Sequence, residues 1–389
     1  MREFAYVDDD LDLAAAVEAI RRDPLVAFDT EFVGESTYEP QLCLVQIATS
    51  EGIWIIDPLA DVDLSDFWAA LTEEGREVLA VAARQEVLFC LRYAKRPPAV
   101  LFDPQLAAGL VGLGYPLSHT NLVFKVLNVR VEAGETFTDW RRRPLSPAQL
   151  EYAASDVRHL IAIRERIMKL ATKMQREDWV RGECAALVAK AIQREAEESW
   201  TRLGGLTRLK PREQAAAREL WRWRDGVAQA ANLPPRRILG DDLLMQVAKR
   251  MPRNVNNLFA LRGFDRPQLR REGEQIVRAV ATALELPDDE LPNRRRREEP
   301  QQLQILGQLC SVVANNLAAR HQVDPALLAT TADLQDLVRW HLGMSEDTRP
   351  AILDGWRGDI LGGPLLDLLK GKSTVRVADA QAASPLKIE

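Results

Sequence analysis

Leu25-Val26-Ala27-Phe28-Asp29-Thr30-Glu31-Phe32 is an apolar run of strand length that ends in two acids one residue apart. Residues i and i+2 of an extended chain point to the same face, so Asp29 and Glu31 are predicted to project together from the end of a buried strand. Two carboxylates this close repel each other unless a cation lies between them, and hard cations such as Mg²⁺ prefer oxygen ligands. Taken alone, the pair is explained more simply by a strand that ends in a polar turn, because acids commonly flank strands.

Composition limits the classes of protein that the chain can belong to. Its 389 residues are too many for one compact core, so two or three domains are expected. The net charge of −6, from 51 basic and 57 acidic residues, argues against a protein that coats nucleic acid. It leaves room for a nucleic-acid enzyme, because a local basic groove is sufficient for binding.

The cysteines and histidines do not have the spacing of a zinc site or a redox motif. They are scattered along the chain at Cys43, Cys90, Cys184, Cys310, His119, His159, His321 and His341. Buried thiols in a reducing compartment explain the cysteines. The first residues, MREFAYVDDD, form no apolar signal region, and no apolar run approaches the roughly 20 residues that cross a bilayer. We therefore expect a cytoplasmic protein with no membrane segment.

The first ~170 residues alternate between strand and helix patterns. Strands are predicted at residues 4–7, 25–28, 42–48, 53–56 and 78–83, and helices at 11–20, 64–71 and 85–93. From there on the pattern is helical. Strands followed by helices predict an α/β domain in which helices cover a mixed sheet of five or six strands.

One helix start is unusually clear in the sequence. Ser146-Pro147-Ala148-Gln149 combines an N-cap serine, proline at the first helical position and glutamine three residues after the serine, which is a capping box. The helix is predicted to run over residues 147–170. Tyr152 and Asp156 lie four residues apart on it and therefore share one face.

The rest of the chain is predicted to form helical units. We expect a first domain at residues 1–170, a helical connector at 171–209, an all-α domain at 210–286, a charged linker at 287–302, a second all-α domain at 303–377 and a disordered tail at 378–389. Both all-α units have apolar residues at helical spacing and no strand alternation.

Several arginines and tryptophans have two interpretations. The arginine runs 141–143 and 294–297 are either solvated charges or contacts to phosphate. Trp140 is more simply explained by packing. Trp221 and Trp223 are two apart on a predicted helix and cannot share a face, so one is expected in the core. The other is expected to be exposed, either as a stacking surface for a base or as a domain contact.

Four acids and one tyrosine remain to be explained. Glu86 lies at the start of the helix that follows the strand at 78–83, and it joins Asp29, Glu31, Tyr152 and Asp156. Hydrolysis of a phosphodiester by two metals needs carboxylates that converge from several elements. A phenol close to them could orient the attacking water.

These residues carry a resemblance to a known family. The segments FDTEF, QLCLVQIA and TDWRRRPLSPAQLEYAASDV resemble ribonuclease D, in the branch of the acid-rich 3′-to-5′ exonuclease superfamily that is marked by a tyrosine. LWRWRDGVAQAANLPPRRIL and DGWRGDILGGPLLDLLKG are similar to the helicase-and-ribonuclease-D C-terminal domain, a small helical module that binds nucleic acid. The resemblance implies a ribonuclease H-like exonuclease core followed by two such modules.

The resemblance also implies roles for the five residues. Asp29 would bridge two divalent metal ions, Mg²⁺ or Mn²⁺, and Glu31 and Asp156 would complete the first metal site. Tyr152 would position the nucleophilic water. Glu86, in AARQEVLF, falls where the family has an aspartate for the second metal.

The chain departs from the family pattern at three positions. Glu stands at 86 in place of Asp, Val81 replaces a usual histidine, and Ala133 occupies the expected place of a lysine. The longer Glu86 side chain moves its carboxylate outward by about 1.5 Å. We therefore expect an intact first metal site and an altered second one, with slow or Mn²⁺-preferring activity.

The implied function is a 3′-to-5′ exoribonuclease that releases nucleoside monophosphates. Its partner would be RNA with a free single-stranded 3′ end, such as a tRNA precursor, and the protein would act as a monomer. Two alternatives stay open: an RNA-binding protein on the same scaffold with weak or lost catalysis, and an exonuclease directed at DNA.

Overall fold

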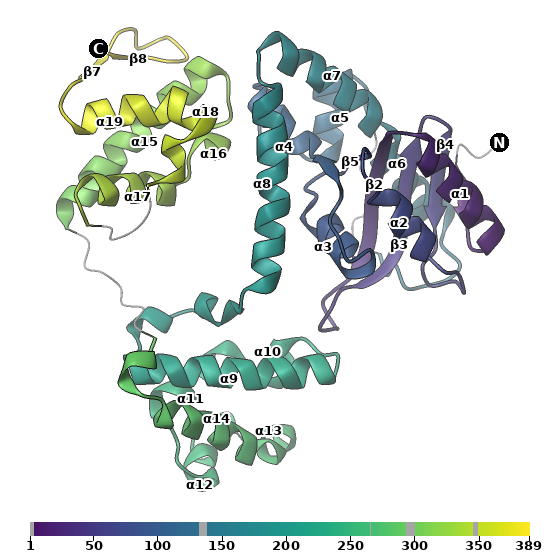
Figure 1. Ribbon diagram of the computed structural model, residues 1–389. Coiled ribbons are helices and arrows are strands. Elements are labelled where there is room, and N and C mark those ends of the chain that lie inside the picture. Colours follow the sequence, from purple (N-terminus) through teal and green to yellow (C-terminus); the bar gives the residue numbers. More distant parts are fainter. Residues whose placement is uncertain (1–3, 132–137, 265, 293–299, 345–348) are drawn as a thin grey trace.

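The computed structural model describes residues 4–131, 138–264, 266–292, 300–344 and 349–389 (Figure 1). Within these ranges the chain forms an α/β domain, a long helix and two helical domains. No helix in the described ranges is both long enough and apolar enough to cross a membrane.

The α/β domain is built on a mixed sheet, as predicted. Its described strands follow the order β1-β4-β3-β2-β5-β6 and are β1 Ala5–Val7, β2 Leu25–Val33, β3 Gln41–Thr49, β4 Gly52–Ile56, β5 Glu77–Leu79 and β6 Val100–Phe102. Strand β2 is antiparallel to β3 and parallel to β5. The sequence analysis missed β6 and made β5 too long, because only three residues of each strand pair with a neighbour.

Strand β2 is longer than its neighbour β5. It pairs with β5 only over residues 25–27, whereas its pairing with β3 reaches Val33. Asp29 and Glu31 therefore lie inside the strand and not at its end, which corrects the prediction. They occupy the part of β2 whose second edge extends beyond β5.

Helices cover both faces of this sheet. Helices α1 (Asp10–Arg22), α2 (Ser65–Leu71) and α3 (Arg84–Tyr93) pack on the face that carries Phe28. Helices α6 (Pro147–Arg158) and α7 (Leu160–Lys173) pack on the face that carries Ala27, together with α4 (Pro104–Leu110) and α5 (His119–Leu127). Asp29 and Glu31 point to this second face, because they alternate with Phe28 and Thr30.

The capping box predicted at the start of α6 is present. The Gln149 backbone N–H donates to Ser146 Oγ at 3.2 Å, and the Ser146 N–H donates to Gln149 Oε1 at 2.8 Å. The prediction of one helix over 147–170 is wrong, because α6 ends at His159 and α7 begins directly after it. His159 has ψ near −5°, which turns the chain between the two helices.

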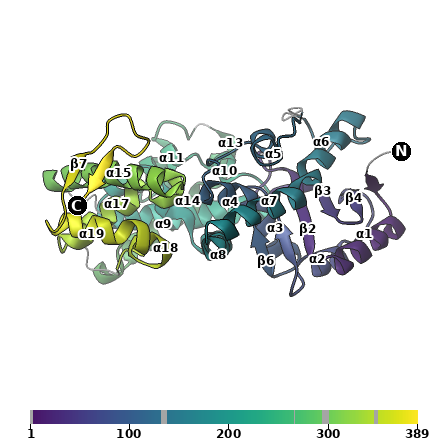
Figure 2. The same ribbon diagram turned by 90° about the horizontal axis from the view of Figure 1, so that it is seen from above.

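Helix α8 (Glu177–Ala196) connects the α/β domain to two helical domains. Figures 1 and 2 show the α/β domain and the second helical domain on opposite sides of α8. The first helical domain contains α9 Pro211–Ala230, α10 Pro235–Ile238, α11 Asp241–Arg250, α12 Val255–Phe259, α13 Pro267–Arg271 and α14 Gly273–Glu285. The second contains α15 Gln301–His321, α16 Pro325–Leu328, α17 Thr331–His341, α18 Gly355–Arg357 and α19 Gly363–Leu369.

The tail differs from the predicted disorder. Strand β8 (Leu386–Ile388) pairs with β7 (Val375–Val377). The buried Asn316 side chain on α15 donates to the Leu386 carbonyl at 3.0 Å and accepts from its N–H at 2.9 Å. A buried amide needs such partners, so Asn316 holds the strand against the second helical domain.

The second helical domain is joined tightly to α8 and to the α/β domain. Arg357 forms an ion pair with both carboxylate oxygens of Glu183, and Trp356 donates to the same carboxylate at 2.9 Å. The Trp356 ring stacks on Trp179 with 4.7 Å between centroids. Arg176 donates to the Leu110 carbonyl at 2.6 Å and to a carbonyl at the end of α15. We call this set of contacts the α8 interface.

The first helical domain is attached by fewer contacts. It has its own apolar core, whereas the second domain shares a continuous core with the α/β domain. Tyr38, in the loop after β2, donates its hydroxyl to Asp225 at 3.0 Å and its N–H to Asn232 at 3.2 Å. Trp221 and Trp223 are both half-buried in this domain, so the expectation of one core and one exposed ring is wrong.

Gly109 on α4 lies where the α/β domain packs against the second helical domain, so a substitution there tests how close this packing is. A Cβ at this position would lie 2.5 Å from Leu327 Cδ1 and 2.8 Å from Tyr115 Cβ. We predict that Gly109→Ala destabilises the protein by about 1–3 kcal/mol in urea unfolding, because the interface is overpacked. Gly182→Ala, in α8, is the matched control and should stabilise by up to about 1 kcal/mol, since nothing lies within 4 Å of its Cβ. An equal effect of both substitutions would contradict this packing.

Candidate active site

The predicted acids come from three separate elements. Asp29 and Glu31 are on β2, Glu86 is at the start of α3, and Asp156 is on α6. The first turn of α3 reaches the part of β2 that extends beyond β5, so Glu86 approaches the strand there. Charge interactions connect Glu31 with Asp29, Glu86 and Asp156, so the four carboxylates lie in one neighbourhood.

The ionised forms of Asp29 and Glu31, the two acids on β2, are destabilised by their surroundings. Burial raises the pKa of Asp29 to about 6, although a backbone hydrogen bond from Thr30 opposes the shift. Burial raises the pKa of Glu31 to about 8, and repulsion from Asp29, Asp156 and Glu86 adds to it. These shifts show a site that resists carrying all its negative charges at once.

Glu86 faces the other acids and not the solvent. Its side chain is 5% exposed, and burial followed by the charge of Asp29 raises its pKa to about 8. The Thr30 hydroxyl donates to Glu86 Oε1 at 2.8 Å on the face of β2 against which α3 packs. This bond fixes the longer glutamate at a position where the family pattern has aspartate. Thr30 was missed by the sequence analysis, which had no local pattern to identify it.

Asp156 and Tyr152 share one face of α6, as predicted. Asp156 is 8% exposed, and burial and the charge of Asp29 raise its pKa to about 8, while a hydrogen bond from Tyr152 lowers it. Burial and the nearby Asp156 raise the pKa of Tyr152 well above its usual value, so the phenol stays protonated at neutral pH. The Tyr152 ring contacts the buried Trp140 at 6.1 Å between centroids, which supports a packing role for Trp140.

His119 is a second residue that the sequence analysis did not identify. It begins α5, and its Nδ1 lies 3.6 Å from Asp156 Oδ1. Burial, with repulsion from His159, lowers the pKa of His119 to about 4, so the imidazole is neutral at pH 7. The residues lie 37 positions apart along the chain, and nothing in the local sequence connects them.

The arginines before α6 are engaged in protein contacts. Arg143 forms an ion pair with Asp57 and donates to the Cys43 carbonyl at 2.7 Å, so it supports the fold. Arg141 and Arg142 pair with Asp139 on the surface. Of the two other departures from the family pattern, Val81 is half-buried beside the apolar core, and Ala133 lies outside the described residues.

The donor set fits a hard divalent cation. Glu86 and Asp156 are buried and Asp29 and Glu31 are half-buried, and charges within this set raise the pKa values of Glu31, Glu86 and Asp156. Asp156 Oδ2 is buried with no hydrogen-bond partner among the described residues. Carboxylate oxygens are the ligands that Mg²⁺ and Mn²⁺ prefer. In the described ranges, no three His, Cys, Asp or Glu side chains form a preformed metal cage. The fit therefore rests on the chemistry and burial of the donors.

Comparison with known proteins gives consistent matches. The family model described as "3'-5' exonuclease" matches residues 4–172, and the HRDC domain model matches residues 213–280. Ribonuclease D of Gluconacetobacter diazotrophicus is 35% identical over 94% of this chain and 93% of its own length. Ribonuclease D of Haemophilus influenzae is 31% identical over 94% of this chain and 93% of its own.

A solved structure supports the same relationship. The crystal structure of Escherichia coli RNase D, described as an exoribonuclease involved in structured RNA processing, superposes with a TM-score of 0.83 at 26% identity. The match covers 95% of this chain and 99% of that chain. It therefore includes the α/β domain, α8 and both helical domains.

The raised pKa values of these carboxyl groups predict how the stability of the metal-free protein depends on pH. The folded protein holds protons that the unfolded chain releases near pH 4, so stability is greatest at low pH and falls as pH rises through about 6 to 8. We expect thermal unfolding in EDTA to shift down by at least a few degrees between pH 5.5 and pH 9. Glu31→Gln should reduce this loss, whereas Glu74→Gln, an exposed acid on another loop, should not. A midpoint that rises over this range would contradict the buried acid cluster.

Proposed function

This chain belongs to the ribonuclease D family and is a 3′-to-5′ exoribonuclease, and on that basis we propose that it trims the single-stranded 3′ ends of tRNA precursors and other small structured RNAs with two divalent metal ions. The proposal is supported above all by the buried carboxylates that converge from β2, α3 and α6. The products are nucleoside monophosphates.

We propose that the four acids divide between two ions, Mg²⁺ or Mn²⁺. Asp29, Glu31 and Asp156 would hold the first ion, and Asp29 and Glu86 would hold the second. Such ions, when bound, stabilise charge on the attacking and leaving oxygens of a phosphodiester. The bond from Thr30 to Glu86 supports a second site in which the glutamate is held in one orientation.

Tyr152 is proposed to position the attacking water. Its hydroxyl stays protonated and lies next to Asp156, so it can hold a water by hydrogen bond. The water oxygen gives up a proton to solvent and forms a bond to phosphorus, while the bond from phosphorus to the 3′ oxygen of the preceding nucleotide breaks and that oxygen takes up a proton from solvent. Packing of Tyr152 on Trp140 restricts the ring and supports this role.

The substrate class follows from the relatives and from the domain arrangement. The Escherichia coli protein is described as acting in structured RNA processing. Two helical domains beside the catalytic domain give a folded RNA a surface to rest on, and HRDC is the model matched by the first of them. We also propose that the protein acts as a monomer in the cytoplasm.

We keep the predicted domain limits as part of the proposal. They are 1–170 for the exonuclease domain, 171–209 for the connector, 210–286 and 303–377 for the helical domains, and 287–302 for the linker. The β7–β8 pair extends the second helical domain to the end of the chain.

Release of nucleoside monophosphates tests the proposal. We predict that the protein with Mg²⁺ or Mn²⁺ shortens a hairpin RNA with a single-stranded 3′ tail and slows at the duplex. Asp156→Asn should lower kcat by at least about a hundredfold, because a neutral amide replaces a carboxylate ligand and the ion is held less well in place. Chromatography of the released nucleotides measures the rate.

Two controls make the result specific. Asp178→Asn removes the same charge from a side chain that is 90% exposed on α8, and it should leave the rate unchanged. A DNA hairpin of the same sequence should be cut more slowly than the RNA. Full activity of Asp156→Asn would disprove the proposed site, and a preference for DNA would disprove the proposed substrate.

A further inference from the structure

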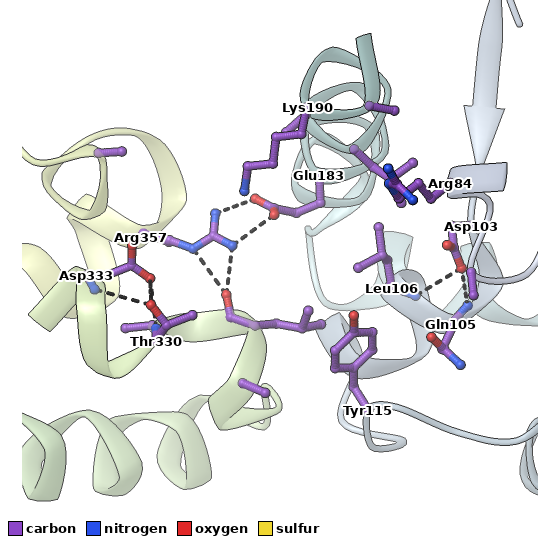
Figure 3. A pocket seen from close by; sticks show the side chains of 18 of the residues that line it. Arg84, Asp103, Gln105, Leu106, Tyr115, Glu183, Lys190, Thr330, Asp333 and Arg357 are labelled. Carbon is purple, nitrogen blue, oxygen red and sulfur yellow. Dashed lines mark hydrogen bonds and ion pairs between the residues drawn. The ribbon is translucent and has the colours of Figure 1, made fainter. Parts of the chain in front are cut away.

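A cavity of about 580 Å³ lies where the catalytic domain, α8 and the second helical domain meet (Figure 3). The catalytic domain contributes Arg84 and Tyr115, α8 contributes Lys190 and Arg194, and the second helical domain contributes Leu327. All three parts are held together by the α8 interface, so the cavity has rigid walls.

The acids around this cavity are already bound by other groups. Glu183 is engaged by Arg357 and Trp356. Asp103 caps α4 and accepts from the Gln105 N–H at 2.8 Å. Asp333 accepts from the Thr330 hydroxyl at 2.7 Å in the capping box of α17. None of these carboxylates needs a further cation to satisfy it.

Three of the positively charged side chains that line the cavity, unlike its acids, have no partner of opposite charge among the described residues. Arg84, Lys190 and Arg194 are exposed, and none of them forms an ion pair with another described residue. Lys190 and Arg194 are four apart, so they follow one another along the same face of α8. The cavity therefore carries three free positive charges in a chain whose net charge is −6, and this pattern favours an anion with several charges.

The cavity lies next to the elements that carry the active site. Asp103, which lines the cavity, accepts from the Ala83 N–H at 3.2 Å at the start of α3, the helix that carries Glu86. Tyr115 precedes His119 by four residues, and His119 lies 3.6 Å from Asp156. A strand bound at the carboxylates can thus extend along the cavity wall toward α8.

The floor of the cavity suits a base. The lining includes the apolar side chains of Leu106, Leu187, Leu327 and Ile352 and the ring of Tyr115, and Figure 3 shows Leu106 and Tyr115 on the side of the catalytic domain. Sites for single-stranded nucleic acid combine cations that contact the backbone with apolar or aromatic groups under the bases. A free inorganic anion would leave this apolar floor without a partner.

We propose that this cavity binds the single-stranded RNA immediately upstream of the nucleotides held at the carboxylates. Lys190 and Arg194 contact adjacent phosphates, Arg84 contacts the strand between them and the active site, and a base packs against the apolar floor. The assignment rests on the proposed function, because it needs an RNA whose 3′ end is in the active site.

The test compares two double variants on two substrates. Lys190→Ala with Arg194→Ala removes two charges from the cavity, and Arg166→Ala with Lys169→Ala removes two exposed charges from α7 as the matched control. The substrates are a 12-nucleotide RNA and a dinucleotide, which is too short to reach α8. Both are measured as kcat/KM at 50 mM and 200 mM salt.

We expect the cavity variant to lose about tenfold in kcat/KM on the 12-mer at 50 mM salt and nothing on the dinucleotide. Loss of two phosphate contacts lowers the salt slope by about 1.4, so its deficit should shrink about sevenfold at 200 mM. The control should match the wild type on both substrates, and both variants should keep the wild-type unfolding midpoint.

Three results would overturn the assignment. The cavity variant could match its control on the 12-mer, or it could lose as much on the dinucleotide. It could also lose only its inhibition by the nucleoside monophosphate product, which would make the cavity a mononucleotide site. These results leave the proposed exoribonuclease function intact. If the wild type releases no nucleotide from either RNA, the proposed function fails, and this assignment fails with it.

Discussion

The repulsion between four clustered carboxylates, two of them buried and two half-buried, is the constraint on which the catalytic domain depends. It arises because β2 extends beyond β5, which leaves room for Glu86 to approach from α3 while Asp156 approaches from α6. Burial alone would favour neutral acids, and proximity makes each further ionisation harder. A site of this kind is stable as a set of anions only when cations share it, so the fold carries a local cost that metal binding would remove.

The two helical domains are attached to this core in different ways. The second shares an apolar core with the catalytic domain and is fixed by Arg176, Glu183 and Arg357. The first has a separate core and reaches the catalytic domain through Tyr38. A fixed domain is suited to form part of a binding wall next to the active site. A domain with a separate core is better suited to adjust to folded RNAs of different shape.

Local patterns in the sequence predicted much of the site. Asp29 and Glu31 follow the period of a strand, and Tyr152 and Asp156 follow the period of a helix whose capping box is written in four residues. The contacts that were missed join distant segments: Thr30 with Glu86, His119 with Asp156, and Asn316 with Leu386. No period or spacing encodes such pairs, since each depends on how whole elements pack. The same reason explains why strand β6 and the break at His159 escaped prediction.

Proton release on metal binding tests the central claim most directly. At pH 7 a pKa of about 8 leaves Glu31, Glu86 and Asp156 mostly protonated, while Asp29, near 6, is mostly ionised. Cations bind the deprotonated carboxylates, so protons must leave. Calorimetric titration of the metal-free protein with Mn²⁺, in buffers of different ionisation enthalpy, counts them. The account predicts release of about two to three protons per chain. Binding heats that do not depend on the buffer would mean that no protons leave, and this result would contradict the account.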